Sequence, residues 1–366
     1  MGIVFGLERW DRIKKTYGAW WRGELDRPVV QVYFYGAEPD RPEPDLPEYP
    51  FTAKYDISVP PEAIVDRWDY NLSRQRFAGD AFPRVWPNFG PGVMAAFMGG
   101  VLENAEDTVW FHPAGNPDIQ DLRFSYNPDN HWCRRVKDIC AAAIERWQGR
   151  VLISMTDLGG NLDILSTFRP GEALLLDLYD APDEVKRLTW EAHEAWFKYY
   201  NDINSCLQPL NPGYSAWAGI YSEDPSYMLQ CDFCYMIGPD MFDEYVKPEL
   251  AASSRRLVNA FYHLDGPGAL RHLDALLDIH DLDGIQWVMG AGQPGPLEWI
   301  DVYRRIQERG KLFQLVNTDA AVAGIDEIEA VIDRLGTGKG MLARIMAHAD
   351  EEQEVCQRLS RLGIEP

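Results

Sequence analysis

The sequence predicts an α/β protein, a (β/α)8 TIM barrel with an N-terminal extension, built as a single domain over residues 1–366. Three observations support this fold class. The chain has 366 residues, a length that suits one α/β barrel with insertions. Hydrophobic residues make up 46% of it, which is enough to bury a sizeable core. From about residue 129, short apolar runs alternate with helical patterns, as parallel strands alternate with crossover helices.

Eight apolar runs have the length of barrel strands, and eight strands fit a closed barrel better than an open sheet. Residues 1–80 hold the extension and the first strand. Within them, residues 36–50 are rich in proline and acidic residues and predict a loop, because proline removes backbone donors. The expected strands are Val29–Tyr35, Arg84–Asn88, Arg150–Thr156, Ser215–Gly219, Ala260–Leu264, Gly284–Met289, Lys311–Val316 and Met341–Ile345.

The helices between the strands are predicted from their apolar stripes and their first residues. In residues 182–205, apolar side chains step by three or four positions, and the segment begins with proline followed by two acidic residues. That beginning suits the positive end of a helix. Residues 239–257 begin in the same way, and Pro248 predicts a kink because it lacks the helical N–H. Two later helices are expected at 296–308 and 326–335.

Charge and cysteine content limit the expected partners and compartment. The net charge of −22 repels nucleic acid and anionic membranes, so we expect neither as a partner. No apolar run approaches the roughly 18 residues of a membrane helix. The six cysteines are sparse for a chain of this length, which favours a reducing compartment, and the N-terminus has no signal-peptide pattern. Together these features predict a cytoplasmic protein.

His263 and Asp265 are the sharpest candidates for chemistry. In a barrel, reactive groups lie at the carboxyl ends of the strands, and residues two apart on a strand share a face. An imidazole and a carboxylate there would transfer a proton or hold a metal ion. In the structural alternative, Asp265 caps the helix that begins near Pro267 and His263 makes a hydrogen bond in the core.

Other side chains that follow the expected strands complete the candidate site. Asp232 lies in Cys231-Asp-Phe-Cys234, a C-x2-C pair that is weak evidence for zinc without two further ligands. We expect Asp232 to join His263 and Asp265 as a catalytic residue. The expected substrate contacts are Asp157, Trp217, Tyr221, Trp287 and Arg344.

The stretch 290–295 matches the G-x-G-x-x-G pattern of dinucleotide sites between a strand and a helix. It follows the sixth of eight strands, however, and Pro294 costs the loop one donor. A tight glycine turn is the favoured interpretation, and no NAD is expected.

Residues 230–250 (QCDFCYMIGPDMFDEYVKPEL), followed by Tyr262-His-Leu-Asp-Gly266, resemble the uroporphyrinogen decarboxylase superfamily. The resemblance extends over residues 20–359 and is strongest over 150–310. It implies a (β/α)8 barrel that is either a decarboxylase or a methyltransferase acting with a corrinoid protein.

Two departures narrow what the resemblance implies. The Arg-rich motif with which the porphyrinogen decarboxylases bind carboxylates is absent near residues 28–36. The zinc methyltransferases use His-x-Cys and a later Cys, whereas this chain has His263-Leu-Asp265 and no later cysteine before Cys356. The resemblance therefore implies an altered zinc site, with His263, Asp265 and Cys231 as its candidate ligands.

The resemblance favours a methyltransferase or demethylase that moves a methyl group from a small O- or N-methylated substrate to a corrinoid protein. That partner would carry the cofactor, because the chain lacks a cobalamin signature of its own. The alternative is a metal-independent decarboxylase or lyase of a small carboxylic acid. A binding barrel without catalysis and an NAD enzyme are more distant alternatives. We also expect a homo-oligomer.

Overall fold

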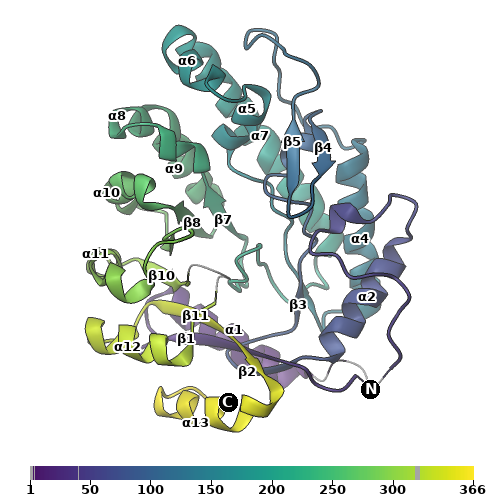
Figure 1. Ribbon diagram of the computed structural model, residues 1–366, viewed down its shortest axis with the longest axis vertical. Helices are drawn as coiled ribbons and strands as arrows, with labels where there is room; N and C mark the ends of the chain where they lie inside the picture. Colours follow the sequence, from purple (N-terminus) through teal and green to yellow (C-terminus); the bar gives the residue numbers. More distant parts are fainter. Residues whose placement is uncertain (1–2, 4, 40, 318–321) are drawn as a thin grey trace.

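A seven-stranded, mostly parallel sheet with helices around it is the central feature of the computed structural model, which describes residues 3, 5–39, 41–317 and 322–366 (Figure 1). Neighbouring strands of this sheet are parallel, except that β2 runs antiparallel to β1. In spatial order the strands are β2 (Arg76–Gly79), β1 (Val29–Tyr35), β11 (Met341–His348), β10 (Leu312–Leu315), β9 (Gly284–Val288), β8 (Asn259–Asp265) and β7 (Ser226–Gln230).

Five of the eight expected strands form where the apolar runs predict them, as β1, β8, β9, β10 and β11. Two others shrink to two residues each, β3 (Arg84–Val85) and β6 (Leu152–Ile153), which pair in parallel with each other. The prediction of a strand at Ser215–Gly219 is wrong. That segment belongs to a loop, residues 211–222, and the strand follows it as β7.

The backbone hydrogen bonds between strands do not establish the predicted closure of the barrel. Within the described ranges, β3 and β6 form a separate pair beside the seven-stranded sheet. A single hydrogen bond from Met155 N to Ser215 O at 2.8 Å joins the end of β6 to the 211–222 loop. The bond from Asp80 N to Val30 O at 2.9 Å only extends the pairing of β2 with β1. The structure thus shows an α/β fold with a mostly parallel sheet, open on the side of β3 and β6.

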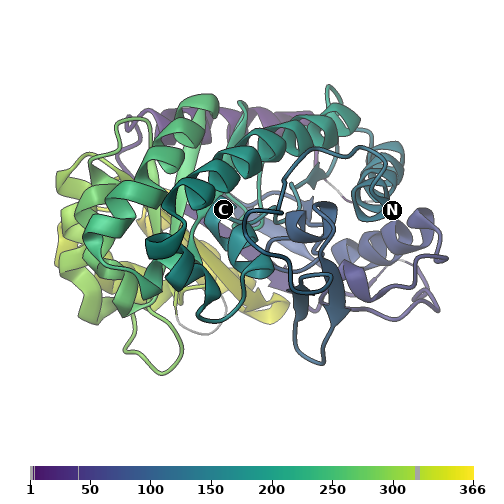
Figure 2. The same cartoon turned by 90° about the horizontal axis from the view of Figure 1, so that it is seen from above.

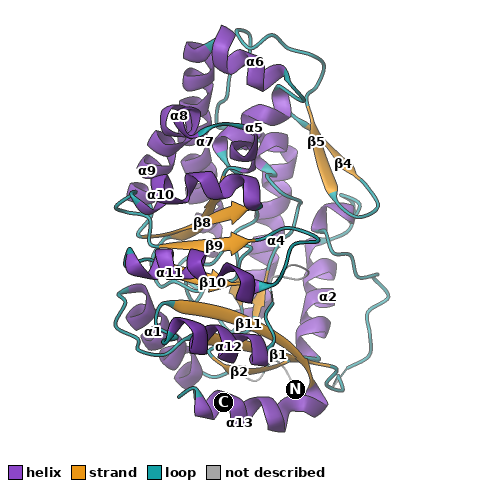
Figure 3. Cartoon of the chain, turned by 60° about the vertical axis from the view of Figure 1, so that its left-hand side comes forward, coloured by secondary structure: helices purple, strands orange, loops and turns teal. Residues whose placement is uncertain are grey.

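Helices cover the outside of the sheet (Figure 3), and α2, α4, α5 and α7 form a second group to the side of it (Figure 1). Within that group α4 contacts both α2 and α7. Figure 2 shows the hairpin of β4 (Val101–Asn104) and β5 (Val109–His112) projecting from the body. The helices are α1 (Leu7–Trp21), α2 (Pro61–Ser73), α3 (Met94–Phe97), α4 (His131–Trp147), α5 (Asn161–Phe168), α6 (Ala173–Asp180), α7 (Pro182–Leu207), α8 (Pro239–Met241), α9 (Lys247–Arg256), α10 (Leu273–Leu277), α11 (Ile300–Glu308), α12 (Ile325–Leu335) and α13 (Glu352–Arg361).

The expected kink at Pro248 is present as a change of helix type. A π-helical turn at Phe242–Val246 separates α8 from α9, immediately before the proline. Because Pro248 has no N–H for the regular helical bond, widening of the preceding turn is the expected adjustment.

The N-terminal helix α1 belongs to the core. Trp10, Tyr17 and Trp20 are buried. The ring of Trp20 stacks on Phe261 of β8 with a centroid separation of 5.7 Å. The ring of Tyr17 meets Tyr221 edge-on at 5.5 Å. This helix thus joins the first residues of the chain to strands and loops more than 200 positions later.

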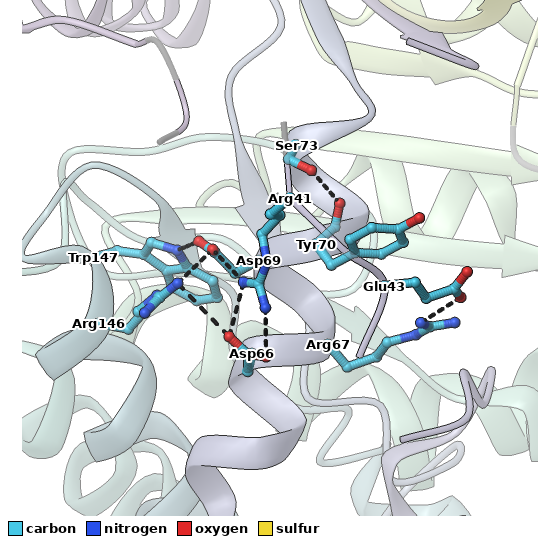
Figure 4. Close-up of polar contacts among 9 residues, drawn as sticks. All are labelled: Arg41, Glu43, Asp66, Arg67, Asp69, Tyr70, Ser73, Arg146 and Trp147. Atoms are coloured by element: carbon cyan, nitrogen blue, oxygen red, sulfur yellow. Dashed lines mark hydrogen bonds and ion pairs between the residues drawn. The ribbon is translucent and has the colours of Figure 1, made fainter. Parts of the chain in front are cut away.

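The proline-rich loop at 36–50 is held against α2 by ion pairs (Figure 4). Arg41 contacts Asp66 at 2.7 Å and Asp69 at 3.2 Å, and Arg67 contacts Glu43 at 2.6 Å. Figure 4 also shows Arg146 and Trp147 of α4 meeting Asp69. Asp69 therefore links the loop, α2 and α4.

Among the residues described, no helix combines the length and apolar character that crossing a membrane requires.

Candidate functional site

Polar side chains form a belt along the face of the sheet that meets the 211–222 loop. Gln230 pairs in register with His263, His263 with Gln286, and Gln286 with Gln314. Register partners on neighbouring strands point to the same face. We call this set, with Arg344 and Gln31, the polar belt. In strand order it comprises Gln230, His263, Gln286, Gln314, Arg344 and Gln31.

A relay of hydrogen bonds in the belt fixes the tautomer of His263. The carbonyl of Ala218 can only accept, so the amide nitrogen of Gln314 faces it, at 3.1 Å. The oxygen of Gln314 then accepts from Gln286 Nε2 at 2.8 Å. This leaves Gln286 Oε1 to accept from His263 Nδ1 at 2.5 Å. His263 therefore carries its proton on Nδ1, and the Nε2 lone pair is available to a metal ion or a proton.

Three side chains converge at the carboxyl ends of β7 and β8. The ligand atoms of Asp232, His263 and Asp265 all lie within 4.8 Å of one another. His263 and Asp265 come from β8, and Asp232 opens the short helix Asp232–Met236 that follows β7. Two carboxylates and an imidazole suit a divalent ion such as zinc. The fit is strengthened because a metal-binding histidine usually donates its other N–H to a fixed acceptor.

Two more carboxyl groups, those of Asp157 and Asp163, lie next to this cluster. Asp157 is buried, and this burial raises its pKa to about 6. Asp163 accepts from the backbone N–H of Asp232 at 3.0 Å and of Phe233 at 2.8 Å. Burial, and then the charge of Asp232, raise the pKa of Asp163. Enclosure by protein, and then the charge of Asp265, likewise raise the pKa of Asp232. Asp157, Asp163 and Asp232 thus retain protons more readily than isolated carboxylates, and a bound cation would lower that tendency.

The predicted substrate contacts divide into two groups. The ring of Trp217 meets that of His263 edge-on at 5.1 Å, and Arg344 lies in the polar belt. Tyr221 instead packs in the core against Trp10, Tyr17 and Phe82. Trp287 is fully buried beside Trp299, because it alternates with the belt residue Gln286 and so points to the opposite face.

The predicted zinc ligand Cys231 lies outside the group of described residues whose geometry could hold a metal ion. Its thiol is hydrogen-bonded with Cys234, and this contact together with burial holds its pKa well above the usual range. A thiol that resists ionisation is a poor zinc ligand. Asp232, the next residue in the chain, lies in that group with His263 and Asp265.

Sequence reasoning missed Asp163 and the two glutamines of the relay. Asp163 follows the same expected strand as Asp157, which was the available signal. The glutamines carried none, because their role depends on the register between strands and glutamine has no catalytic chemistry of its own.

A cleft of about 670 Å³ reaches Asp232 of the cluster. Asp163, Gln230 and Asp232 line it, and so does the β4–β5 hairpin with Trp110. Trp110 is 57% exposed and Tyr235, also at the cleft, is 53% exposed. The cleft is therefore an aromatic entrance to a cluster of ionisable groups.

Comparison with protein-family models and with curated proteins finds no match. Among solved structures, a methyltransferase from Methanosarcina mazei superposes with a TM-score of 0.60 at 15% identity, over 92% of this chain and 93% of that one. A crystal structure of macrophomate synthase matches with a TM-score of 0.23 at 13% identity, over 63% of this chain and 73% of that one. The first match establishes a shared fold over almost the whole of both chains.

Proposed function

We propose that this protein is a methyltransferase of the uroporphyrinogen decarboxylase superfamily, with the (β/α)8 barrel architecture of that family. It would move a methyl group from a small O- or N-methylated substrate to a separate corrinoid protein. The observation that carries the proposal is the meeting of Asp232, His263 and Asp265 at the strand ends, with the Nε2 lone pair of His263 left free. The fold shared with the methyltransferase from Methanosarcina mazei supports it.

Asp232, His263 and Asp265 would hold a zinc ion. When bound there, zinc supplies Lewis acidity to the atom that loses the methyl group. Gln286 holds the imidazole ring in one tautomer through its 2.5 Å contact. Trp217, whose ring touches that of His263, would form a wall for the substrate, and Asp157 would contribute a polar contact. The cleft gives the corrinoid partner a route to the methyl group.

A decarboxylase or lyase that needs no metal is the second candidate. Burial raises the pKa of Asp157 to about 6, so this side chain is partly protonated near neutral pH and would supply the proton that replaces carbon dioxide. Metal content separates the two candidates, because only the first requires an ion at the cluster.

The decisive experiment combines metal analysis with a methyl-transfer assay. Purified protein, a reduced corrinoid partner and a panel of methoxy and methylamine compounds should yield a methylated corrinoid and demethylated product. We expect about one zinc per chain, and we expect His263→Ala and Asp265→Asn to lose both metal and activity. His280→Ala, at a histidine that is 97% exposed in its side chain, is the matched control and should behave as the wild type. Product formation without any metal, or carbon dioxide release in place of methyl transfer, would refute the proposal.

A further inference from the structure

Two arginines lie beside each other at the 211–222 loop. Arg84 begins β3, Arg344 lies in β11, and both are half-buried. A Cβ atom on Gly219 would stand 2.1 Å from Arg344 Nη2 and 2.8 Å from Arg84 Cζ. The two guanidinium groups therefore flank Gly219, and any side chain at this position would displace them.

The acceptors that hold these arginines are all neutral. Arg84 donates three bonds of 3.3 Å, and Arg344 donates bonds of 2.6 and 3.2 Å. Within the described ranges, neither side chain forms an ion pair, whereas Arg27 reaches Asp80 at 2.7 Å. The acceptors are Ser154 Oγ and the carbonyls of Ala216 and Trp217 for Arg84, and the Ala218 carbonyl and Gln31 Oε1 for Arg344.

This arrangement is electrostatically incomplete. Burial, and then the charge of Arg344, lower the pKa of Arg84 to about 10. The ion pairs of the described ranges leave both cations without an anionic partner. Two such cations that are partly withdrawn from water destabilise each other, and an anion between them would offset that cost. The buried hydroxyl of Tyr33 lies beside Arg84 and interacts with its guanidinium group, where the hydroxyl oxygen would accept and its own O–H would remain to donate. It is a further donor for such an anion.

We propose that Arg84 and Arg344 bind the carboxylate of the substrate, so that the substrate is a small methylated carboxylic acid. The methylated part of this statement rests on the proposed function. The binding of a carboxylate does not, since it follows from the two arginines alone.

The surroundings favour a carboxylate over phosphate. Carbonyl oxygens from residues 216–218 already point at the two guanidinium groups, and they would repel a dianion more than a singly charged group. A planar carboxylate also matches the planar fork of a guanidinium, to which it binds through two parallel hydrogen bonds.

The carboxylate site and the metal-binding cluster are joined through Trp217. Its carbonyl accepts from Arg84, and its ring lies 5.1 Å from that of His263. A small acid anchored by the two arginines would extend along this ring towards His263. The carbonyl near Arg84 and the ring near His263 both belong to Trp217, so the two sites are separated by the length of one residue. This limits the substrate to a few bonds between the carboxylate and the methylated atom.

Binding of matched acid and amide pairs tests the proposal without turnover. Methoxyacetate is compared with methoxyacetamide, and N,N-dimethylglycine with its amide, by calorimetry and by the shift in melting temperature. We expect at least one acid to bind about tenfold or more tightly than its amide, and Arg84→Gln and Arg344→Gln to lose this preference by about ten- to a hundredfold. Arg304→Gln, at an exposed arginine paired with Asp301, is the control and should keep it.

Circular dichroism establishes that each variant is folded, and Arg344→Lys supplies a milder change should Arg344→Gln fail to fold. The lysine variant should bind the acids at least several-fold more weakly, because it loses the planar fork. Equal binding of acids and amides, equal binding of inorganic phosphate, or an acid preference that survives in both arginine variants would overturn the proposal. Because no corrinoid partner is present, failure here leaves methyl transfer standing, and failure of methyl transfer leaves carboxylate binding standing.

Discussion

At the scale of single residues, the chemistry of His263 depends on its neighbour. Gln286 accepts from Nδ1 at 2.5 Å, and its own orientation is fixed through Gln314 by the carbonyl of Ala218. An imidazole held in this way presents one lone pair in one direction. Gln286 is therefore a positioning residue for His263 in the proposed metal site.

Replacing Gln286 tests this role. Gln286→Leu removes the acceptor, so we expect zinc affinity to fall about ten- to a hundredfold in competition with a chromophoric chelator. Gln286→Glu keeps an acceptor oxygen and should retain zinc binding within a few-fold. Long-range 1H–15N spectra should show a proton on Nδ1 of His263 in the wild type and a mixture of tautomers in the leucine variant. Unchanged zinc affinity in Gln286→Leu would contradict the relay.

Asp157 makes the stability of the folded protein depend on pH. Burial raises its pKa in the folded protein to about 6, above the value of about 3.9 in an unfolded chain. The folded state therefore binds the proton more tightly than the unfolded chain does. For this reason the contribution of Asp157 to the free energy of unfolding falls as the pH rises from about 4 through 6.

Asp157→Asn should remove this loss. The asparagine oxygen still accepts from Gly159 N, a bond of 2.9 Å in the wild type. Without added metal, we expect the variant to be more stable than the wild type at pH 8, by up to about 3 kcal/mol, and the difference to vanish near pH 4. Urea unfolding across this range measures it. A variant that is less stable at pH 8 would show that the charge on Asp157 is paired in the folded protein.

At the scale of elements, the 211–222 loop shows why part of the fold could not be predicted. The run 215–219 is apolar because it is buried, and a buried loop gives the same signal as a buried strand. Asn211 explains how the loop replaces a strand. Its side chain accepts from Ile153 N at 2.9 Å and donates to Ile153 O at 3.0 Å, the bonds that a neighbouring strand would make.

The site likewise has one part that the sequence predicts and another that it does not. The proximity of His263 and Asp265 follows from the two-residue period of a strand, which the sequence shows directly. The alignment of Gln286 with His263 depends on pairing between segments, which the sequence does not show. The sequence predicts Trp287 at the site, but its side chain lies on the face opposite to that of Gln286. A shift of one residue along a strand reverses the face, and the apolar run does not indicate which face points inward.

Asn211→Ala tests the replacement of a strand by a side chain. It leaves the N–H and the C=O of Ile153 without partners inside the protein, so we expect the free energy of unfolding to fall by about 2–4 kcal/mol. Asn204→Ala, which removes a bond to a carbonyl within α7, is the control and should cost less than about 1 kcal/mol. Equal losses in the two variants would show that the Ile153 backbone finds other partners, such as water.

At the scale of the whole molecule, α1 connects the two parts of the fold. Its aromatic side chains contact β8 through Phe261 and the 211–222 loop through Tyr221. It also reaches Phe82, which lies just before β3. The predicted N-terminal extension is thus packed between the seven-stranded sheet and the β3–β6 pair, and neither part has a separate core: the buried apolar residues form one continuous cluster.

One cluster predicts one unfolding transition for the chain. The far-UV circular dichroism signal and tryptophan fluorescence should therefore change together in urea. Trp20→Ala should lower stability by about 3–5 kcal/mol, because Trp20 is fully buried, and it should keep the two signals coincident. Trp110→Ala, at a tryptophan that is 57% exposed, should change stability by no more than about 0.5 kcal/mol. If Trp20→Ala instead separates the signals into two transitions, the seven-stranded sheet and the part around β3 and β6 unfold as independent units, and the single-domain prediction is wrong.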